Sequence, residues 1–105
     1  MPERRTTPRA DVALPCVLRR RSGSAIDART VDLGAGGMRI ATARPLATDE
    51  VLEFDLLLSE AERVDGRARV LRQDGHDAYA MRFEGLLEPA RERLRQALAS
   101  APPLN

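Results

Sequence analysis

The sequence is poor in aromatic residues and carries almost no excess charge of either sign. Phe, Trp and Tyr together make up 3% of the 105 residues, and tryptophan is absent. Proteins that bind single-stranded nucleic acid without sequence preference usually stack the bases on several aromatic rings. Nucleic-acid-binding proteins also tend to have a large basic excess, whereas the net charge here is +1. Both scarcities argue against a nucleic-acid-binding protein.

Lysine is absent, so all 17 basic residues are arginine, and there is one cysteine. A single Cys16 cannot form an internal disulfide, which fits a reducing cytoplasm. The sequence contains no apolar run with the length of a signal peptide or a membrane span. We therefore expect a soluble cytoplasmic protein that does not associate with membranes.

The residues that most often carry catalysis are few and poorly placed for it. Cys16 falls on a row of apolar residues, a position typical of a core side chain. His76 lies in a predicted turn without other metal-type residues around it, and Glu60 and Glu62 lie in another predicted turn. No nucleophile, base and orienting acid can be assembled from these groups. The sequence therefore predicts neither an enzyme nor a metal or cofactor site.

Alternation of apolar and polar residues predicts six short strands. They cover residues 12–21, 26–33, 38–40, 52–58, 64–70 and 79–83. Pro15 favours a sheet edge or a bulge in the first strand. In the second strand the buried row changes parity around Arg29, from Ile26 and Ala28 to Val31 and Leu33, which predicts a bulge or a bend there. Asp74-Gly75 is a strong hairpin signal before the last strand.

One amphipathic helix is predicted after the strands. Pro89, just inside Glu88, is typical of a helix start, and Ala101-Pro-Pro103 ends the helical pattern. The apolar residues at helical spacing are Leu87, Ala90, Leu94, Ala97 and Leu98. A chain of 105 residues supports one domain. Periodicity thus predicts a mostly antiparallel β fold with a C-terminal helix, and unpaired edges favour closure into a barrel.

A stretch without bulky side chains follows the second predicted strand. It begins at Asp32 and contains Gly34, Gly36 and Gly37. Glycine permits the positive φ of a bulge or a tight turn, and it lets a flat polar ligand approach the backbone closely. The Asp32 carboxylate could accept hydrogen bonds from such a ligand.

A complementary stretch lies at the N-terminus, where Arg4, Arg5 and Arg9 lie within a polar segment. An arginine fork can bind the two acceptors O6 and N7 of guanine, or a phosphate, and a carboxylate can accept from guanine's donor edge. An arginine-rich arm facing Asp32 therefore suits a guanine nucleotide. The alternative is that these arginines form only a solvated tail.

Taken in order, the two stretches resemble the signature of the PilZ family, R-x-x-x-R followed by [D/N]-x-S-x-x-G. Arg5-Thr-Thr-Pro-Arg9, preceded by Arg4, is similar to the first part, and Asp32-Leu-Gly-Ala-Gly-Gly37 to the second. The resemblance implies a six-stranded antiparallel β-barrel with a C-terminal α-helix and cyclic di-GMP as ligand. Residues 1–11 are polar, with two prolines and no apolar period, so we expect a flexible arm there in the absence of ligand, followed by the barrel and helix over 12–100 and a tail over 101–105. The ligand-binding residues that the resemblance implies are Arg4, Arg5, Arg9, Asp32, Gly34 and Gly37.

Gly34 stands where the family has serine. A serine hydroxyl bond contributes about 0.5 to 1.5 kcal/mol, which is roughly a twofold to tenfold change in affinity. The departure therefore predicts weakened rather than abolished binding. The function expected is a bacterial cyclic di-GMP receptor that orders its arm on the barrel and presents a new surface to a partner protein. The alternative is a degenerate domain that binds nucleotide weakly or not at all and serves as a protein-interaction or homodimerisation module.

Overall fold

The computed structural model describes residues 9–100, with the side chains of residues 10–99. Its elements are β1 (Arg9–Ala10), β2 (Pro15–Arg19), β3 (Ala25–Gly34), β4 (Gly37–Ala41), β5 (Val51–Leu57), β6 (Arg63–Gln73), β7 (Ala78–Glu84) and α1 (Glu88–Ser100). No helix in this described part is both long and apolar enough to span a membrane.

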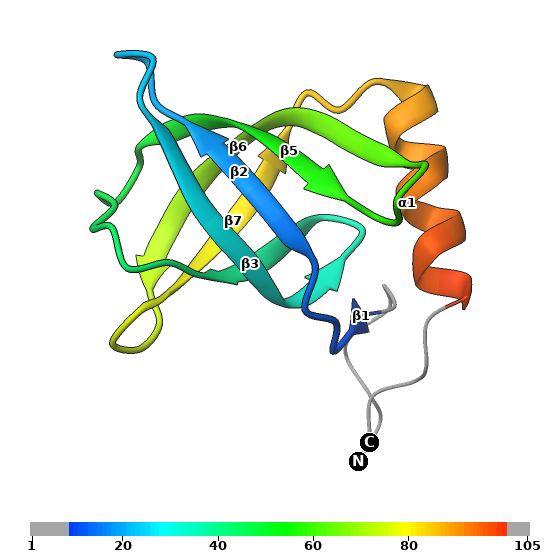
Figure 1. Cartoon of the computed structure of the whole chain (residues 1–105), viewed down its shortest axis with the longest axis horizontal. Helices are drawn as coiled ribbons and strands as arrows, with labels where there is room; N and C mark the ends of the chain where they lie inside the picture. Colours follow the sequence, from blue (N-terminus) through cyan, green and yellow to red (C-terminus); the bar gives the residue numbers. More distant parts are fainter. Residues whose placement is uncertain (1–8, 101–105) are drawn as a thin grey trace.

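Strands β2 to β7 form a closed antiparallel barrel, and α1 lies beside it (Figure 1). The strand order is β1-β3-β2-β5-β6-β7-β4, and an additional pairing of β3 with β4 closes the sheet on itself. Closure satisfies the backbone groups that an open sheet would leave unpaired at its edges. The predicted fold class, a six-stranded antiparallel barrel with a C-terminal helix, is confirmed.

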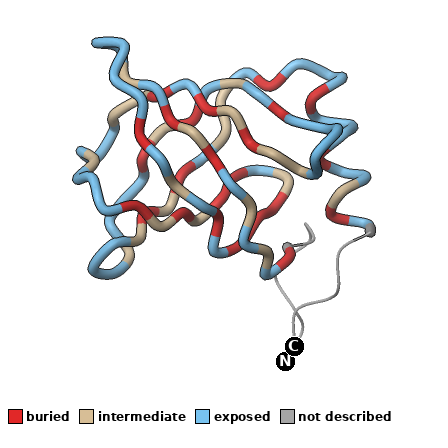
Figure 2. Tube along the Cα trace, in the orientation of Figure 1, coloured by how far each residue is buried: buried red, intermediate tan, exposed pale blue. Residues whose placement is uncertain are grey.

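The barrel interior is mostly aliphatic, as the scarcity of aromatic residues requires. Buried and exposed residues alternate along the strands (Figure 2), so each strand turns one face inward. Leu18, Ile40 and Leu56 are fully buried. The rings of Phe54 and Phe83 lie 5.1 Å apart between their centroids and add an aromatic contact.

Helix α1 covers part of the barrel with its apolar stripe. Ala90, Leu94 and Leu98 are buried, whereas the charged residues between them face solvent. The helix begins at Glu88 with Pro89 in its first turn, as predicted, because proline fits a position whose amide has no partner within the helix.

The predicted first strand, residues 12–21, is longer than the strand observed. β2 begins at Pro15, where the missing amide proton of proline costs no ladder hydrogen bond. The preceding residues are held to β3 in another way, by the buried Thr30 side chain. Thr30 Oγ1 accepts a 2.8 Å hydrogen bond from the amide of Leu14 and donates one to the carbonyl oxygen of Val12.

Two register shifts interrupt the barrel ladders, and each leaves an apolar side chain outside. In β3 the shift lies between Thr30 and Asp32, close to the bend predicted at Arg29. The prediction that Val31 joins the buried row is wrong, because the bulge turns Val31 outward and leaves it 39% exposed. The second shift lies in β6 at Leu71, which is also 39% exposed.

Candidate functional site

Asp32 lies immediately after the β3 bulge and opposite Arg39 of β4. Its side chain is 13% exposed, and its Oδ2 lies 3.7 Å from Nε of Arg39. The same Arg39 nitrogen lies 3.2 Å from Oδ2 of Asp74 in the β6–β7 turn. Arg39 therefore links Asp32, the carboxylate predicted to bind a ligand, to the turn between β6 and β7. A ligand that bound Asp32 would meet a cation beside it.

The N-terminal arginine motif is joined to this place by β1. Arg9 pairs with Gly34 and Ala10 with Leu33, so the motif's last arginine has its backbone beside the glycine that replaces the family serine. Ala10 is buried in the core, which fixes the chain at this point. Arg4 and Arg5 lie outside the described residues, as does the side chain of Arg9.

The glycines after Asp32 do not use the positive φ that glycine permits. Within residues 9–100, positive φ occurs at Gly23, Gly75, Gly85 and Asp49. Gly37 is needed for a different reason. A Cβ built there would lie 2.2 Å from the carbonyl oxygen of Met81, because β4 and β7 run too close for a side chain.

A hollow of about 320 Å³ opens on the outer surface of the barrel beside Asp32. It is bounded by β3, β4, β6 and β7, strands that come from both halves of the sequence. Its lining residues are Asp32, Gly36, Gly37, Met38, Arg39, Leu71, Arg72, Ala80, Met81 and Arg82. Two predicted site residues, Asp32 and Gly37, are thereby brought together, while Gly34 lies at the end of β3 next to β1.

Three arginines of this hollow were missed by the sequence reasoning, namely Arg39, Arg72 and Arg82. A signal for two of them was present, because Arg39 and Arg82 occupy outward positions next to the inward Met38 and Met81. What was lacking was the pairing of β4 with β7, which places them on one surface.

The hollow arginines are also paired with acidic residues around its rim. Nε of Arg72 lies 3.6 Å from Oδ1 of Asp74, and Nη2 of Arg82 lies 3.6 Å from Oε2 of Glu84. Both arginine side chains remain more than half exposed, at 63% and 59%. Exposed pairs of this kind contribute little to stability, so their guanidinium groups can be recruited by an anionic ligand at small cost.

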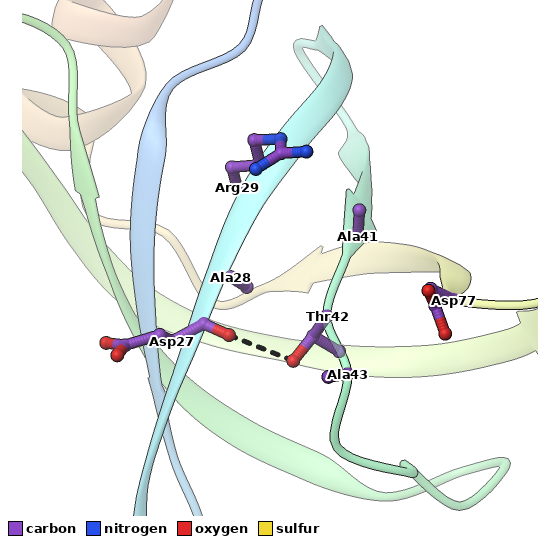
Figure 3. Close-up of a pocket in the computed structure, with 7 residues that line it drawn as sticks. All are labelled: Asp27, Ala28, Arg29, Ala41, Thr42, Ala43 and Asp77. Carbon is purple, nitrogen blue, oxygen red and sulfur yellow. Dashed lines mark hydrogen bonds between the residues drawn. The ribbon is translucent and has the colours of Figure 1, made fainter.

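A second hollow, of about 280 Å³, lies where β3 meets the chain after β4 (Figure 3). The Thr42 hydroxyl is directed at the carbonyl oxygen of Asp27 and donates a 2.9 Å hydrogen bond to it. The Thr42 amide donates a 2.8 Å bond to the carbonyl of Asp77. Thr42 thus links Asp27 of β3 to Asp77, just before β7, at the point where β4 has ended. This is a structural role.

The groups considered for catalysis are placed in structural or solvent-exposed positions. Cys16 is buried, and this burial, with a further contribution from Asp55, raises the pKa of its thiol to about 12. A thiol with so high a pKa is a poor nucleophile at neutral pH. The His76 side chain is 97% exposed and lies 3.6 Å from Asp77. Within the described residues, no group of three or more His, Cys, Asp or Glu could hold a metal ion.

The family model of the PilZ domain matches residues 3–100 of this chain. Three solved structures resemble this one at 17 to 18% identity, and each match covers 93% of this chain. They are the inhibitor of motility MotI/DgrA from Bacillus subtilis (TM-score 0.81), YcgR in complex with c-di-GMP from Escherichia coli (0.80) and the PilZ domain with c-di-GMP of YcgR from Escherichia coli (0.77).

The match spans 51% of the MotI/DgrA chain and 46% of the first YcgR chain, about half of each. It spans 91% of the isolated YcgR domain. At this level of identity, the similarity to these structures shows a shared fold. None of the curated proteins matches the chain.

Proposed function

Because the chain belongs to the PilZ domain family, we propose that it acts as a receptor for cyclic di-GMP. One observation carries the proposal to this chain's own residues. The pairing of β1 with β3 holds the backbone of Arg9, the last residue of the arginine motif, opposite Gly34, two residues after Asp32, which lines the hollow. The YcgR domain, a structural neighbour, has been solved with c-di-GMP.

The chemistry of the ligand fits the groups assembled there. Asp32 accepts hydrogen bonds from the donor edge of a guanine, since a carboxylate has only acceptors to offer. Arg5 and Arg9 bind a guanine acceptor edge, a phosphate or a base plane, and Arg4 assists them. The arginines lining the hollow add positive charge next to a ligand that carries two phosphates.

The proposed signal is an ordering of the N-terminal arm. Ligand bound between the arm and the barrel draws residues before β1 onto the surface, and arm, ligand and barrel rim together form a face that a partner protein reads. Ordering the backbone costs about 1 to 2 kcal/mol per residue, so the arginine contacts must exceed that cost. The solved MotI/DgrA is described as an inhibitor of motility, which illustrates an output that this family can have.

The test is a calorimetric titration of cyclic di-GMP into the wild type and into Arg5→Ala, Arg9→Ala and Gly34→Ser variants. Loss of a charged contact is worth about 1.5 to 3 kcal/mol, so each arginine variant should bind about tenfold to 100-fold more weakly. Gly34→Ser should bind as well as or better than the wild type, by up to about tenfold.

Arg21→Ala is the matched control, because Arg21 is exposed in the β2–β3 turn at the other end of β3 from Gly34. It should bind like the wild type. Equal affinity in the wild type and both N-terminal arginine variants would exclude the proposed site.

A second function is favoured by Gly34 itself. Without the serine hydroxyl, and with Arg39 already beside Asp32, ligand binding is weaker, and the barrel would then serve as a protein-interaction or dimerisation module. The absence of any thermal shift with cyclic di-GMP in the wild type, together with its appearance in Gly34→Ser, would support this alternative.

A further inference from the structure

One large apolar side chain stands outside the core at the start of α1. The sequence placed Leu87 on the apolar stripe of the predicted helix, but α1 begins at Glu88 and Leu87 is 76% exposed. Leu86 is buried instead, against the bare backbone of Gly66 in β6, where a Cβ would lie only 2.6 Å from Cδ2 of Leu86. Gly66 therefore lets the chain lie against the barrel at Leu86, while Leu87 faces solvent.

Leu87 borders a hollow of about 600 Å³, here called the α1 hollow, between the start of α1 and strands β2, β5 and β6. Pro89 and Phe54 add to its apolar surface. Its other large side chains are charged, three arginines and three carboxylates: Arg19, Arg67, Arg93, Glu53, Asp55 and Asp65. The α1 hollow thus combines an exposed leucine with both signs of charge in equal number.

Most of these charges have no partner within the part of the chain that the structure describes. Among residues 10–99, no ion pair or side-chain hydrogen bond is formed by Arg67, Arg93, Glu53 or Asp65. Asp65 lies directly opposite another carboxylate, Asp55, across the β5–β6 ladder. Like charges placed opposite each other destabilise a sheet. An arginine supplied by another molecule would relieve this repulsion, and carboxylates from that molecule would pair with Arg67 and Arg93.

A second copy of this chain can supply both kinds of group. When a surface meets itself about a two-fold axis, the arginines of one copy can face the carboxylates of the other. The equal number of the two signs in the α1 hollow suits such a contact. The whole chain carries a net charge of +1, so two copies repel each other only weakly. A strongly acidic or strongly basic partner would instead leave one set of charges unpaired.

We propose that the α1 hollow is the contact surface of a symmetric dimer. Leu87 of each copy enters the hollow of the other copy, and Arg67 and Arg93 lie against the other copy's carboxylates. The apolar contact supplies affinity, and the charges around it fix the orientation. The α1 hollow shares no lining residue with the hollow beside Asp32, so the inference goes beyond the proposed receptor function and does not depend on it.

Sedimentation velocity of the full chain over about a hundredfold range of concentration measures the association, with circular dichroism to check folding. The wild type should change from monomer to dimer as the concentration rises. Leu87→Ala should raise the Kd of the dimer at least about tenfold, because each copy loses apolar contact with the other. Val31→Ala is the control, since it truncates an apolar side chain that is 39% exposed and outside the α1 hollow; its Kd should stay within about twofold of the wild type.

Charge reversal tests the pairing of arginines with carboxylates. Arg93→Glu makes the α1 hollow acidic and Asp65→Arg makes it basic, so each variant alone should dimerise at least about tenfold more weakly than the wild type. An equimolar mixture of the two should recover a dimer, because opposite charges then meet. Arg91→Glu and Glu60→Arg make the same charge changes at exposed positions outside the α1 hollow, and both should dimerise like the wild type.

Three results would overturn the inference. A wild type that stays monomeric at every concentration leaves the α1 hollow to a different protein or to none. A dimer that is unchanged by Leu87→Ala, Arg93→Glu and Asp65→Arg has its contact elsewhere on the surface. A mixture of the two charge variants that stays monomeric excludes the proposed charge pairing. None of these measurements uses cyclic di-GMP, so the receptor function is decided separately by the calorimetric titrations.

Discussion

Replacing Gly37 by alanine should destabilise the barrel strongly, although alanine is the smallest possible addition. The new Cβ would lie 2.2 Å from the Met81 carbonyl oxygen and 3.2 Å from Cα of Arg82, whereas ordinary contact begins at 3.4 Å. Both obstructing atoms belong to backbone, so no side chain can rotate away. Strands β4 and β7 must move apart where Gly37 pairs with Arg82.

The cost can be estimated from its parts. Overpacking a well-packed region costs about 1 to 3 kcal/mol, and a weakened ladder hydrogen bond adds about 0.5 to 1.5 kcal/mol. Against this, alanine restricts the unfolded chain and returns about 0.4 to 1 kcal/mol. The net loss is about 0.5 to 4 kcal/mol with a midpoint of about 2 kcal/mol, and about 2 kcal/mol lowers the Tm of a domain of this size by about 8 to 16 °C.

The assay is thermal and urea denaturation followed by circular dichroism, with Gly36→Ala as the matched control. A Cβ at Gly36 meets no heavy atom within 4 Å, and Gly36 has no positive φ. Its alanine variant should therefore unfold within about 0.5 kcal/mol of the wild type.

Equal melting temperatures for Gly37→Ala and Gly36→Ala would refute the argument that the approach of β4 to β7 requires Gly37. A Gly37→Ala variant of unchanged stability that no longer bound cyclic di-GMP would show instead that this glycine serves the ligand.

Three further predictions concern stability. Burial raises the pKa of the Cys16 thiol to about 12 from 9.0, so the free energy of unfolding should fall as the pH rises from about 9 to 12, and Cys16→Ala should lose this dependence in urea titrations. A hydrogen bond from Arg20 lowers the pKa of Glu50 from 4.5, so the stability it provides should be lost as the pH falls through and below that value; Glu50→Gln should show a smaller decrease in Tm between neutral pH and about pH 3. Thr30→Val should cost about 1 to 3 kcal/mol by leaving the Leu14 amide unpaired, and Thr30→Ser should retain most of the stability in the same denaturation assay.

Local chemistry was sufficient for most of the fold. The Asp74-Gly75 turn, the helix start at Pro89 and the aliphatic rows of the strands depend on a few neighbouring residues, and the structure contains each of them. Alternation tells which face of a strand is buried because successive side chains point to opposite faces. It fails where a bulge adds a residue, and for this reason Val31 was assigned to the wrong face.

The candidate site was predictable only in part. Asp32 and the arginine motif could be found as sequence stretches, because each is contiguous in the chain. The hollow could not, since it unites Asp32 with Leu71 and Ala80 through the pairings of β3 with β4, β4 with β7 and β7 with β6.

By itself, then, the sequence determined the strands, their inward faces, the helix and two stretches suited to a guanine nucleotide. Tertiary structure alone decided which strands are neighbours, where their registers slip and that Arg39, Arg72 and Ala80 lie side by side. The physical reason is that turn chemistry and alternation act over a few residues. Strand register is instead set by hydrogen bonds and core contacts between segments that are distant in the chain.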